Sequence, residues 1–338
     1  KKRKRVNITI NDVENTVSSL ARVPKKSVAG DDKDKLRRLN SNIKLLIYGQ
    51  DKAIDNITDS ILLSRSGLGN TERPMGSFLF AGPTGVGKTE LCKQLALNLG
   101  IHFECFDMSE YMEKHSVAKL IGAPPGYVGY DRGGLLTDAI HKNPHCVLLL
   151  DEIEKSHPDL FNILLQVMDR GVLTDAQGRS TDFRNVILVM TTNAGAKDME
   201  AGTIGLGNGK KLDISPKRDK AIKNFFSPEF RNRLDKIIHF NKLSFDYIIK
   251  IVDKFLLEVE GKLIEKGIDL VVEDKVKSWL AKEGYDPKMG ARPIGRLIDE
   301  KIKRPLSKEV LFGALEKGGK VKITMNDESE IGFIFENN

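Results

Sequence analysis

The chain carries three short apolar runs, each of which ends in glycine or polar residues. These runs are SFLFAG (77–82), CVLLLDE (146–152) and NVILVMTTN (185–193). Segments with helical spacing separate them, and buried apolar runs that alternate with helices are typical of a parallel sheet. We therefore predict an α/β domain over residues 36–240, with a parallel sheet flanked by helices. Ligands of such sheets bind beyond the carboxyl ends of the strands, which is where all three runs become polar.

The pattern changes after residue 240. Ser244 is suited to cap a long helix, whose apolar positions form one stripe. The stripe consists of Ile248, Ile251, Val252, Phe255, Val259 and Leu263. Further helical spacing leads to two alternating segments, KVKITM (320–325) and EIGFIF (330–335), which predict a terminal hairpin. A smaller α+β domain is therefore predicted over residues 241–338.

The first 35 residues are polar and have little periodicity. We expect residues 1–35 to be a linker that leads in from an upstream module. The net charge of the 338 residues is +7, and KKRKR at residues 1–5 carries +5 of it, which leaves +2 for the rest. This basic tip is more simply a solvated linker than a localisation or phosphate-contacting arm. With no other basic surplus and no apolar run of about 18 residues or more, the chain is expected to bind neither nucleic acid nor a membrane.

The three cysteines, Cys92, Cys105 and Cys146, form no C-x-x-C pair, and each lies in or beside an apolar run. Buried free thiols are therefore favoured over a metal site. This use of cysteine indicates a reducing compartment, and we expect a cytoplasmic protein.

A phosphate-binding sequence begins at the end of the first apolar run. GPTGVGKT matches G-x-x-x-x-G-K-[ST] and lies between a predicted strand and a predicted helix, a context that disfavours a chance glycine-rich turn. Its glycines let backbone N–H groups surround phosphates, which the helix N-terminus also attracts. Lys88 is predicted to reach the β- and γ-phosphates of ATP, and the Thr89 hydroxyl to bind Mg²⁺. The residues predicted to bind ATP or ADP here are Gly82, Pro83, Thr84, Gly85, Val86, Gly87, Lys88 and Thr89.

Acidic and amide side chains end the other two runs. Asp151 and Glu152 close the second run, and Asn193 closes the third. Asp151 is suited to the Mg²⁺ shell, through water, and Glu152 to orienting the attacking water or accepting its proton. Asn193 could hold the same water or sense the γ-phosphate. Taken alone, the acidic pair could be a helix cap, and Asn193 could be a turn residue. In a chain that also contains a P-loop, these residues predict nucleotide hydrolysis.

Four longer segments resemble one family of ATPases. They are GAPPGYVGYDRGGLL (122–136), DEIEKSHPDLFNILLQVMD (151–169), FSPEFRNRLD (226–235) and GARPIGR (290–296). Together with the P-loop and the polar strand ends, they are similar to the Clp unfoldases, which are AAA+ ATPases. The similarity covers nearly the whole chain and is to the second ATPase module of these proteins. It implies an AAA+ large domain, a small C-terminal domain and assembly as a homo-hexamer.

The resemblance assigns roles to three arginines. In FRNRLD, the arginine finger of the family falls on Arg233, with Arg231 close enough to share its task. Such a finger implies a ring in which one subunit completes the site of its neighbour. The alternative is a surface ion pair of Arg233 with Glu229 or Asp235. In GARP, Arg292 matches a sensor that contacts the γ-phosphate and couples the nucleotide state to the angle between domains.

The same resemblance implies which residues contact the adenine of the nucleotide. LIYGQ (46–50) matches the segment that surrounds the base, which gives Ile47 and Tyr48 as cofactor-binding residues. As apolar side chains, both could instead belong to the core.

Two glycine-flanked apolar loops match segments that contact other proteins. In GYVGY (126–130), Tyr127 and Val128 correspond to a pore-lining pair that grips polypeptide through apolar area; a packed turn is the alternative. In AGTIGLGNGKK (201–211), the tripeptide Ile204, Gly205 and Leu206 corresponds to a plug that docks on a ClpP-type peptidase. Glycines around the tripeptide keep such a loop flexible.

The resemblance implies an ATP-dependent protein unfoldase and translocase that threads unfolded polypeptides into a ClpP-type peptidase. Adaptor proteins would act through upstream domains that this chain lacks, and no protease motif of its own is present. A disaggregase-type remodeller is the first alternative, and the docking tripeptide argues against it. A nucleic-acid motor or clamp loader would need a basic channel. A non-hydrolysing ring is disfavoured by Glu152 and Arg233.

Overall fold

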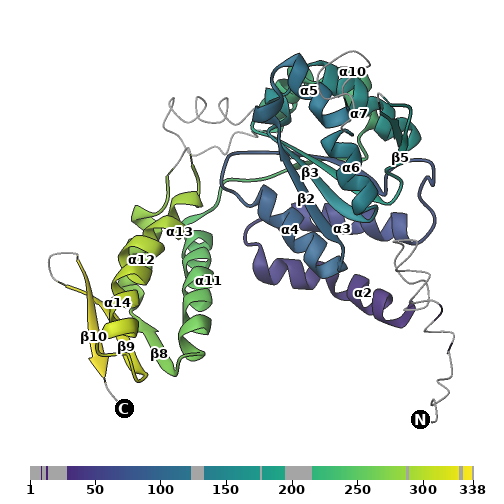
Figure 1. The fold of residues 1–338 in the computed structure, drawn as a ribbon. Helices are drawn as coiled ribbons and strands as arrows, with labels where there is room; N and C mark the ends of the chain where they lie inside the picture. Colours follow the sequence, from purple (N-terminus) through teal and green to yellow (C-terminus); the bar gives the residue numbers. More distant parts are fainter. Residues whose placement is uncertain are drawn as a thin grey trace, which may run out of the picture. The chain divides into compact units, whose positions relative to one another are not determined.

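The computed structural model divides the chain into two compact units, which are described separately (Figure 1). It describes residues 9, 13, 29–122, 133–175, 177–194, 215–286, 289–326 and 330–336. The first unit comprises residues 1–47, 51–82 and 87–240, and the second comprises residues 48–50, 83–86 and 241–338.

The first unit is built on a five-stranded sheet with the order β2-β3-β6-β1-β7, in which every pair of neighbours is parallel. The strands are β1 (Gly76–Ala81), β2 (His102–Asp107), β3 (Cys146–Asp151), β6 (Val186–Thr192) and β7 (Lys236–His239). The three predicted runs become β1, β3 and β6, the three inner strands, which are buried almost throughout. The predicted α/β fold with a parallel sheet is confirmed.

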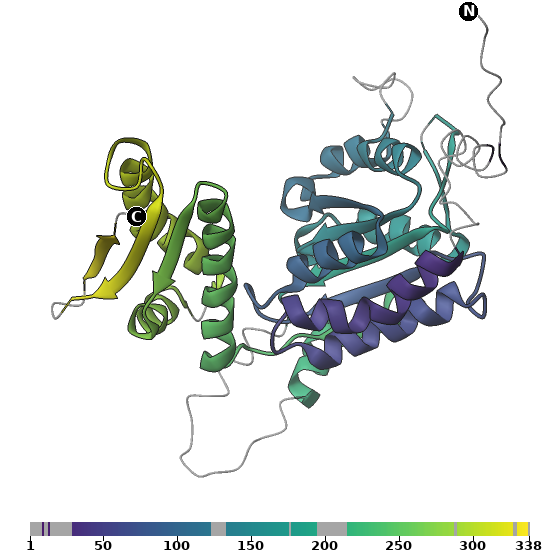
Figure 2. The same cartoon turned by 90° about the horizontal axis from the view of Figure 1, so that it is seen from below.

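Helices cover both faces of this sheet. Helices α2, α3 and α4 lie on one face, and α5, α6, α7 and α10 lie on the other (Figures 1 and 2). The helices of the first unit are α2 (Ala29–Leu46), α3 (Asp51–Arg65), α4 (Lys88–Leu99), α5 (Lys114–Ile121), α6 (Leu135–Lys142), α7 (Asp159–Arg170), α9 (Ser215–Phe225) and α10 (Pro228–Arg233). Short 3₁₀ turns lie at Met108–Tyr111 and Ile153–Lys155, and β4 (Val172–Thr174) and β5 (Ser180–Asp182) form a small hairpin. Successive strand residues point to opposite faces, so Leu148 and Leu150 of β3 join the core under α5, α6 and α7.

Helix α2 begins at Ala29, so the last part of the predicted linker 1–35 is helical. Its apolar contacts start further along, where Leu39 and Ile43 are fully buried. Lys33, Asp34 and Lys35 are exposed, and a polar first turn carries no periodic signal. The predicted boundary between the linker and the first domain was set by apolar spacing, and it therefore lies several residues after the actual start of α2.

The second unit combines helices with a three-stranded sheet of order β10-β9-β8. Its elements are α11 (Phe245–Ile264), β8 (Ile268–Val272), α12 (Asp274–Glu283), α13 (Arg292–Ile298), a π-helical turn (Asp299–Lys303), α14 (Arg304–Phe312), β9 (Gly319–Met325) and β10 (Ile331–Glu336). The predicted hairpin is the antiparallel pair β9–β10. Strand β8 pairs parallel to β9 and was not predicted, because five residues after a long helix give a weak signal.

The predicted stripe on α11 is largely confirmed. Ile248, Val252, Val259 and Leu263 are buried, whereas Ile251 and Phe255 are only partly buried at the edge of the same core. Ser244 occupies the N-cap position, but its side chain makes no capping hydrogen bond. Its backbone carbonyl accepts from the N–H of Ile248 at 3.1 Å.

Two of the three cysteines are buried free thiols, as predicted, and burial raises the pKa of Cys146 to about 12. Cys105 is exposed, because it lies on β2, the edge strand of the sheet. Partial desolvation, with the negative charge of Asp151, still raises the pKa of Cys105 to about 11, which disfavours the reactive thiolate. Across the described ranges, no helix is both long and apolar enough to cross a membrane.

Candidate nucleotide site

The P-loop joins the end of β1 to the start of α4. Gly87, the N-cap residue of α4, has φ of +106°, a left-handed conformation that a side chain would strain. At Gly82, a Cβ would lie 2.7 Å from the backbone oxygen of Phe240, so only glycine fits there. Lys88 and Thr89 are the first two residues of α4. The local structure is thus the strand, glycine-rich turn and helix that the motif predicted.

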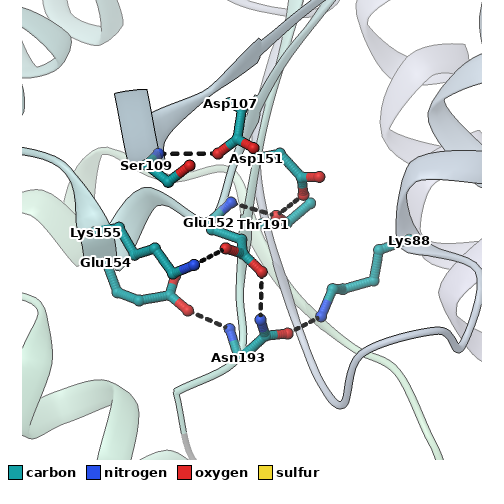
Figure 3. Close-up of polar contacts among 9 residues, drawn as sticks. All are labelled: Lys88, Asp107, Ser109, Asp151, Glu152, Glu154, Lys155, Thr191 and Asn193. Atoms are coloured by element: carbon teal, nitrogen blue, oxygen red, sulfur yellow. Dashed lines mark hydrogen bonds and ion pairs between the residues drawn. The ribbon is translucent and has the colours of Figure 1, made fainter. Parts of the chain in front are cut away.

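Lys88 is the most enclosed charged group of the site, with 8% of the residue exposed. Its Nζ donates to Asn193 Oδ1 at 2.7 Å and to the backbone oxygens of Gly82 and Thr192. Figure 3 shows the side chain extending toward Asn193. These three acceptors are neutral oxygens, and a buried ammonium beside neutral acceptors is a ready partner for an anion.

Asn193 links Lys88 to the predicted catalytic carboxylate. Its Nδ2 donates to Glu152 Oε1 at 3.2 Å, and its backbone N–H donates to Glu154 Oε1 at 2.9 Å (Figure 3). Lys88, Asn193 and Glu152, which were predicted from three separate motifs, are thus joined by consecutive hydrogen bonds. Glu154 was not predicted, because a glutamate two positions after Glu152 had no motif of its own.

Glu152 also forms an ion pair with Lys155, three residues further along the chain. The hydrogen bond to Glu152 raises the pKa of Lys155, so the ammonium form is favoured. Lys155 was not predicted either, although its i,i+3 spacing from Glu152 on a helical turn would have suggested the pair.

Glu152 is the one described non-glycine residue with a positive φ, at +56°. Its backbone N–H donates to the Thr191 hydroxyl at 2.9 Å, and that hydroxyl donates to Asp151. Such strained conformations persist where surrounding contacts hold them and are frequent at functional sites. Thr191 was not predicted, because it precedes Asn193 by two positions inside an apolar strand.

The two predicted finger arginines lie on α10. Arg233 Nε is 2.6 Å from Asp169 Oδ1 on α7, and Arg231 Nε donates to the backbone oxygen of Phe226 at 3.2 Å. The expected alternative partners of Arg233 are wrong: Asp169 takes the place of Glu229 and Asp235. Asp235 instead accepts a hydrogen bond from the backbone N–H of Ser77.

Arg292 and part of the predicted adenine segment (46–50) belong to the second unit. Arg292 is the first residue of α13, and the preceding residue, Ala291, donates its N–H to the P-loop oxygen of Gly85 at 3.2 Å. Gln50 is 2% exposed and donates to the backbone oxygens of Val86 (3.2 Å) and Asn241 (2.9 Å). These bonds explain why residues 48–50 and 83–86 belong to the second unit. Gln50 lies in the matched segment LIYGQ, but only Ile47 and Tyr48 of that segment were predicted as site residues.

The proposed adenine residues differ in their surroundings. Ile47 is 5% exposed and belongs to the first unit, whereas Tyr48 is partly buried and belongs to the second. The pore residues Tyr127 and Val128 and the docking tripeptide Ile204, Gly205 and Leu206 lie outside the described residues.

The site fits MgATP. A glycine-rich loop before a helix, a buried lysine, and a carboxylate at the end of β3, which β6 separates from β1, supply phosphate and metal ligands of the right chemistry. With Asn193 at the end of β6 and a separate small C-terminal unit, these features define the class of AAA+ ATPases.

Comparisons with known proteins narrow the class to a family. Residues 73–237 match a family model described as an AAA domain (Cdc48 subfamily), and residues 243–323 match one described as the C-terminal, D2-small domain of ClpB protein. A "ClpA homolog protein" of Fuscovulum blasticum is 53% identical over 97% of this chain and 41% of that protein. Chaperone protein ClpB of Enterococcus faecalis is 44% identical over 98% of this chain and 38% of that protein, and ClpB of Lactiplantibacillus plantarum gives the same values.

The chain therefore belongs to the Clp family of AAA+ ATPases, in which it corresponds to a second ATPase module. It spans about two fifths of the length of the curated relatives that it matches.

Proposed function

We propose that this chain hydrolyses MgATP and uses the energy to unfold and translocate polypeptides into a ClpP-type peptidase. The hydrogen-bonded series Lys88–Asn193–Glu152 carries the ATPase part of the proposal. It joins a phosphate-binding cation, an amide and a carboxylate in one site, which is the set of groups that nucleotide hydrolysis requires.

Each group has a chemical task in this reaction. Lys88 exchanges its carbonyl and amide acceptors for the β- and γ-phosphates. Glu152, held by Lys155 and Asn193, orients the attacking water and accepts its proton. Thr89, and Asp151 through water, would hold Mg²⁺, which neutralises charge on the phosphates when bound.

Other residues act on the nucleotide from further away. Arg233, assisted by Arg231, serves the site of a neighbouring subunit in a homo-hexamer. Arg292 senses the γ-phosphate, and Ile47 and Tyr48 contact the adenine. These roles rest on the family motifs; Arg231 and Arg233 lie on α10, and Arg292 is the first residue of α13.

The polypeptide part of the proposal rests on the two loop motifs. Tyr127 and Val128 grip an unfolded substrate in the pore, and Ile204, Gly205 and Leu206 dock on the peptidase. Adaptor proteins would act through upstream domains, and the complex would work in the cytoplasm. The ClpA homolog among the relatives supports this assignment.

A disaggregase-type remodeller that works without a protease is the second candidate. The ClpB relatives and the match of residues 243–323 to a ClpB small domain favour it. The Ile204-Gly205-Leu206 tripeptide favours the peptidase-linked function, because a remodeller that works without a peptidase does not require a peptidase-docking loop.

Leu206→Ala is expected to abolish binding of the assembled protein to a ClpP-type peptidase. Burial of one leucine contributes about 1.5–3 kcal/mol, and the loss is repeated in every subunit of a multivalent contact. Co-sedimentation with the peptidase in a slowly hydrolysed ATP analogue measures this, with assembly checked by light scattering.

Leu68→Ala is the matched control, since Leu68 is 81% exposed in the first unit and outside the docking tripeptide. It should bind the peptidase as the wild type does. If assembled wild-type rings ignore the peptidase, the docking proposal fails and the remodeller becomes the better function, with the ATPase proposal unaffected.

A further inference from the structure

One buried hydroxyl connects the two acidic residues at the end of β3. Thr191 lies on β6 beside β3 and is 1% exposed. Its hydroxyl donates to Asp151 Oδ1 and accepts from the backbone N–H of Glu152 at 2.9 Å. Figure 3 shows Thr191 between the two residues. A hydroxyl has one proton to donate and lone pairs to accept, so both bonds can exist together.

Both bonds restrain groups whose orientation matters for hydrolysis. The first restrains one oxygen of Asp151, whose carboxylate would hold Mg²⁺ through water. The second holds the peptide of Glu152, whose φ of +56° is unfavourable for a residue with a side chain. The direction in which the Glu152 carboxylate leaves the backbone depends on that conformation.

We infer that Thr191 is a positioning residue that sets the orientation of both Asp151 and Glu152, an inference that rests on the proposed ATP hydrolysis. Thr191 acts through the two acidic residues, and the inference requires only the hydroxyl of its side chain.

Thr191→Val tests this, because valine keeps the branched shape and the strand preference and removes only the hydroxyl. ATP turnover is expected to fall about tenfold or more, as for the loss of a hydrogen bond to a charged group. In a titration of fluorescent ADP binding with Mg²⁺, the Mg²⁺ concentration that gives half of the gain in ADP affinity is expected to rise by a similar factor. The affinity for ADP without Mg²⁺ should stay within about twofold of the wild-type value. Thr191→Ser restores the hydroxyl and should recover both values to within about threefold.

Thr181→Val is the matched control: Thr181 is also 1% exposed on a strand, and its hydroxyl lies 3.0 Å from His141 Nε2. It should leave both values as in the wild type. Thermal unfolding identifies any variant that does not fold, in which case Thr191→Ala, which also lacks the hydroxyl, replaces Thr191→Val.

The inference is overturned if Thr191→Val matches the wild type in turnover and Mg²⁺ dependence. It is equally overturned if Thr191→Ser is as impaired as Thr191→Val, since packing would then explain the effect. A wild-type protein that binds MgADP but hydrolyses no ATP would defeat the proposed function, and the Mg²⁺ titrations would still decide the role of Thr191.

Discussion

Replacing Arg233 by alanine is expected to lower ATP turnover of the assembled protein by about 10³-fold or more, within the range reported for arginine fingers. In its own chain the guanidinium pairs with Asp169, at 2.6 Å. Among the residues that the structure describes, the side-chain partner of Arg233 is Asp169 and not a member of the Lys88–Asn193–Glu152 series. Under the proposed function, Arg233 acts on the site of a neighbouring subunit, so ATP affinity should change far less than turnover.

Arg184→Ala is the control for the loss of an ion pair, because Arg184 also forms one at 2.6 Å, with Asp182, although its side chain is 51% exposed and that of Arg233 is 35% exposed. Breaking either surface pair should cost about 1 kcal/mol or less of stability. Mixed rings give the sharper test. Arg233→Ala and Glu152→Gln subunits are each expected to be nearly inactive alone, but a mixed ring would contain sites with an intact Glu152 beside an intact Arg233. Full turnover by Arg233→Ala rings would reduce Arg233 to an ion-pair partner of Asp169.

Glu152→Gln is expected to lower turnover by about 10²–10⁴-fold, which is the usual contribution of a general base. Glutamine can still accept from Asn193 Nδ2 through its Oε1, so the hydrogen-bonded series is kept while the charge and the ion pair with Lys155 are lost. ATP should therefore remain bound and unhydrolysed. Steady-state turnover together with the amount of bound nucleotide measures both effects.

Glu110→Gln, at an exposed glutamate of the Met108–Tyr111 turn, makes the same chemical change away from this series. It should leave turnover unchanged. If Glu152→Gln keeps more than about a tenth of the wild-type rate, another group accepts the proton, and the assignment of the base is wrong.

Local patterns in the sequence were enough to predict the inner strands and the motif residues. β1, β3 and β6 are buried on both faces, so they read as uninterrupted apolar runs. β2 is an edge strand with mixed exposure, and HFECFD gives no clear period. Its partly exposed face also explains why Cys105 departs from the expected burial.

The contacts that complete the site depend on the register between strands. Thr191 and Asp151 are 40 residues apart, and they meet because β6 pairs with β3 in one register. Gln50 and Asn241 are 191 residues apart. No local spacing encodes such pairs, so the motifs supplied Lys88, Glu152 and Asn193 without the groups that hold them.

The neutral acceptors around Lys88 have a kinetic consequence. Because carbonyl and amide oxygens already satisfy the ammonium, a phosphate that arrives replaces existing bonds instead of meeting an unpaired charge, which reduces the net gain of binding. When the phosphate departs, Lys88 can bond again to the same oxygens. Product dissociation therefore does not leave the buried ammonium without acceptors. We expect ADP to dissociate more readily than it would from a site that had no such acceptors.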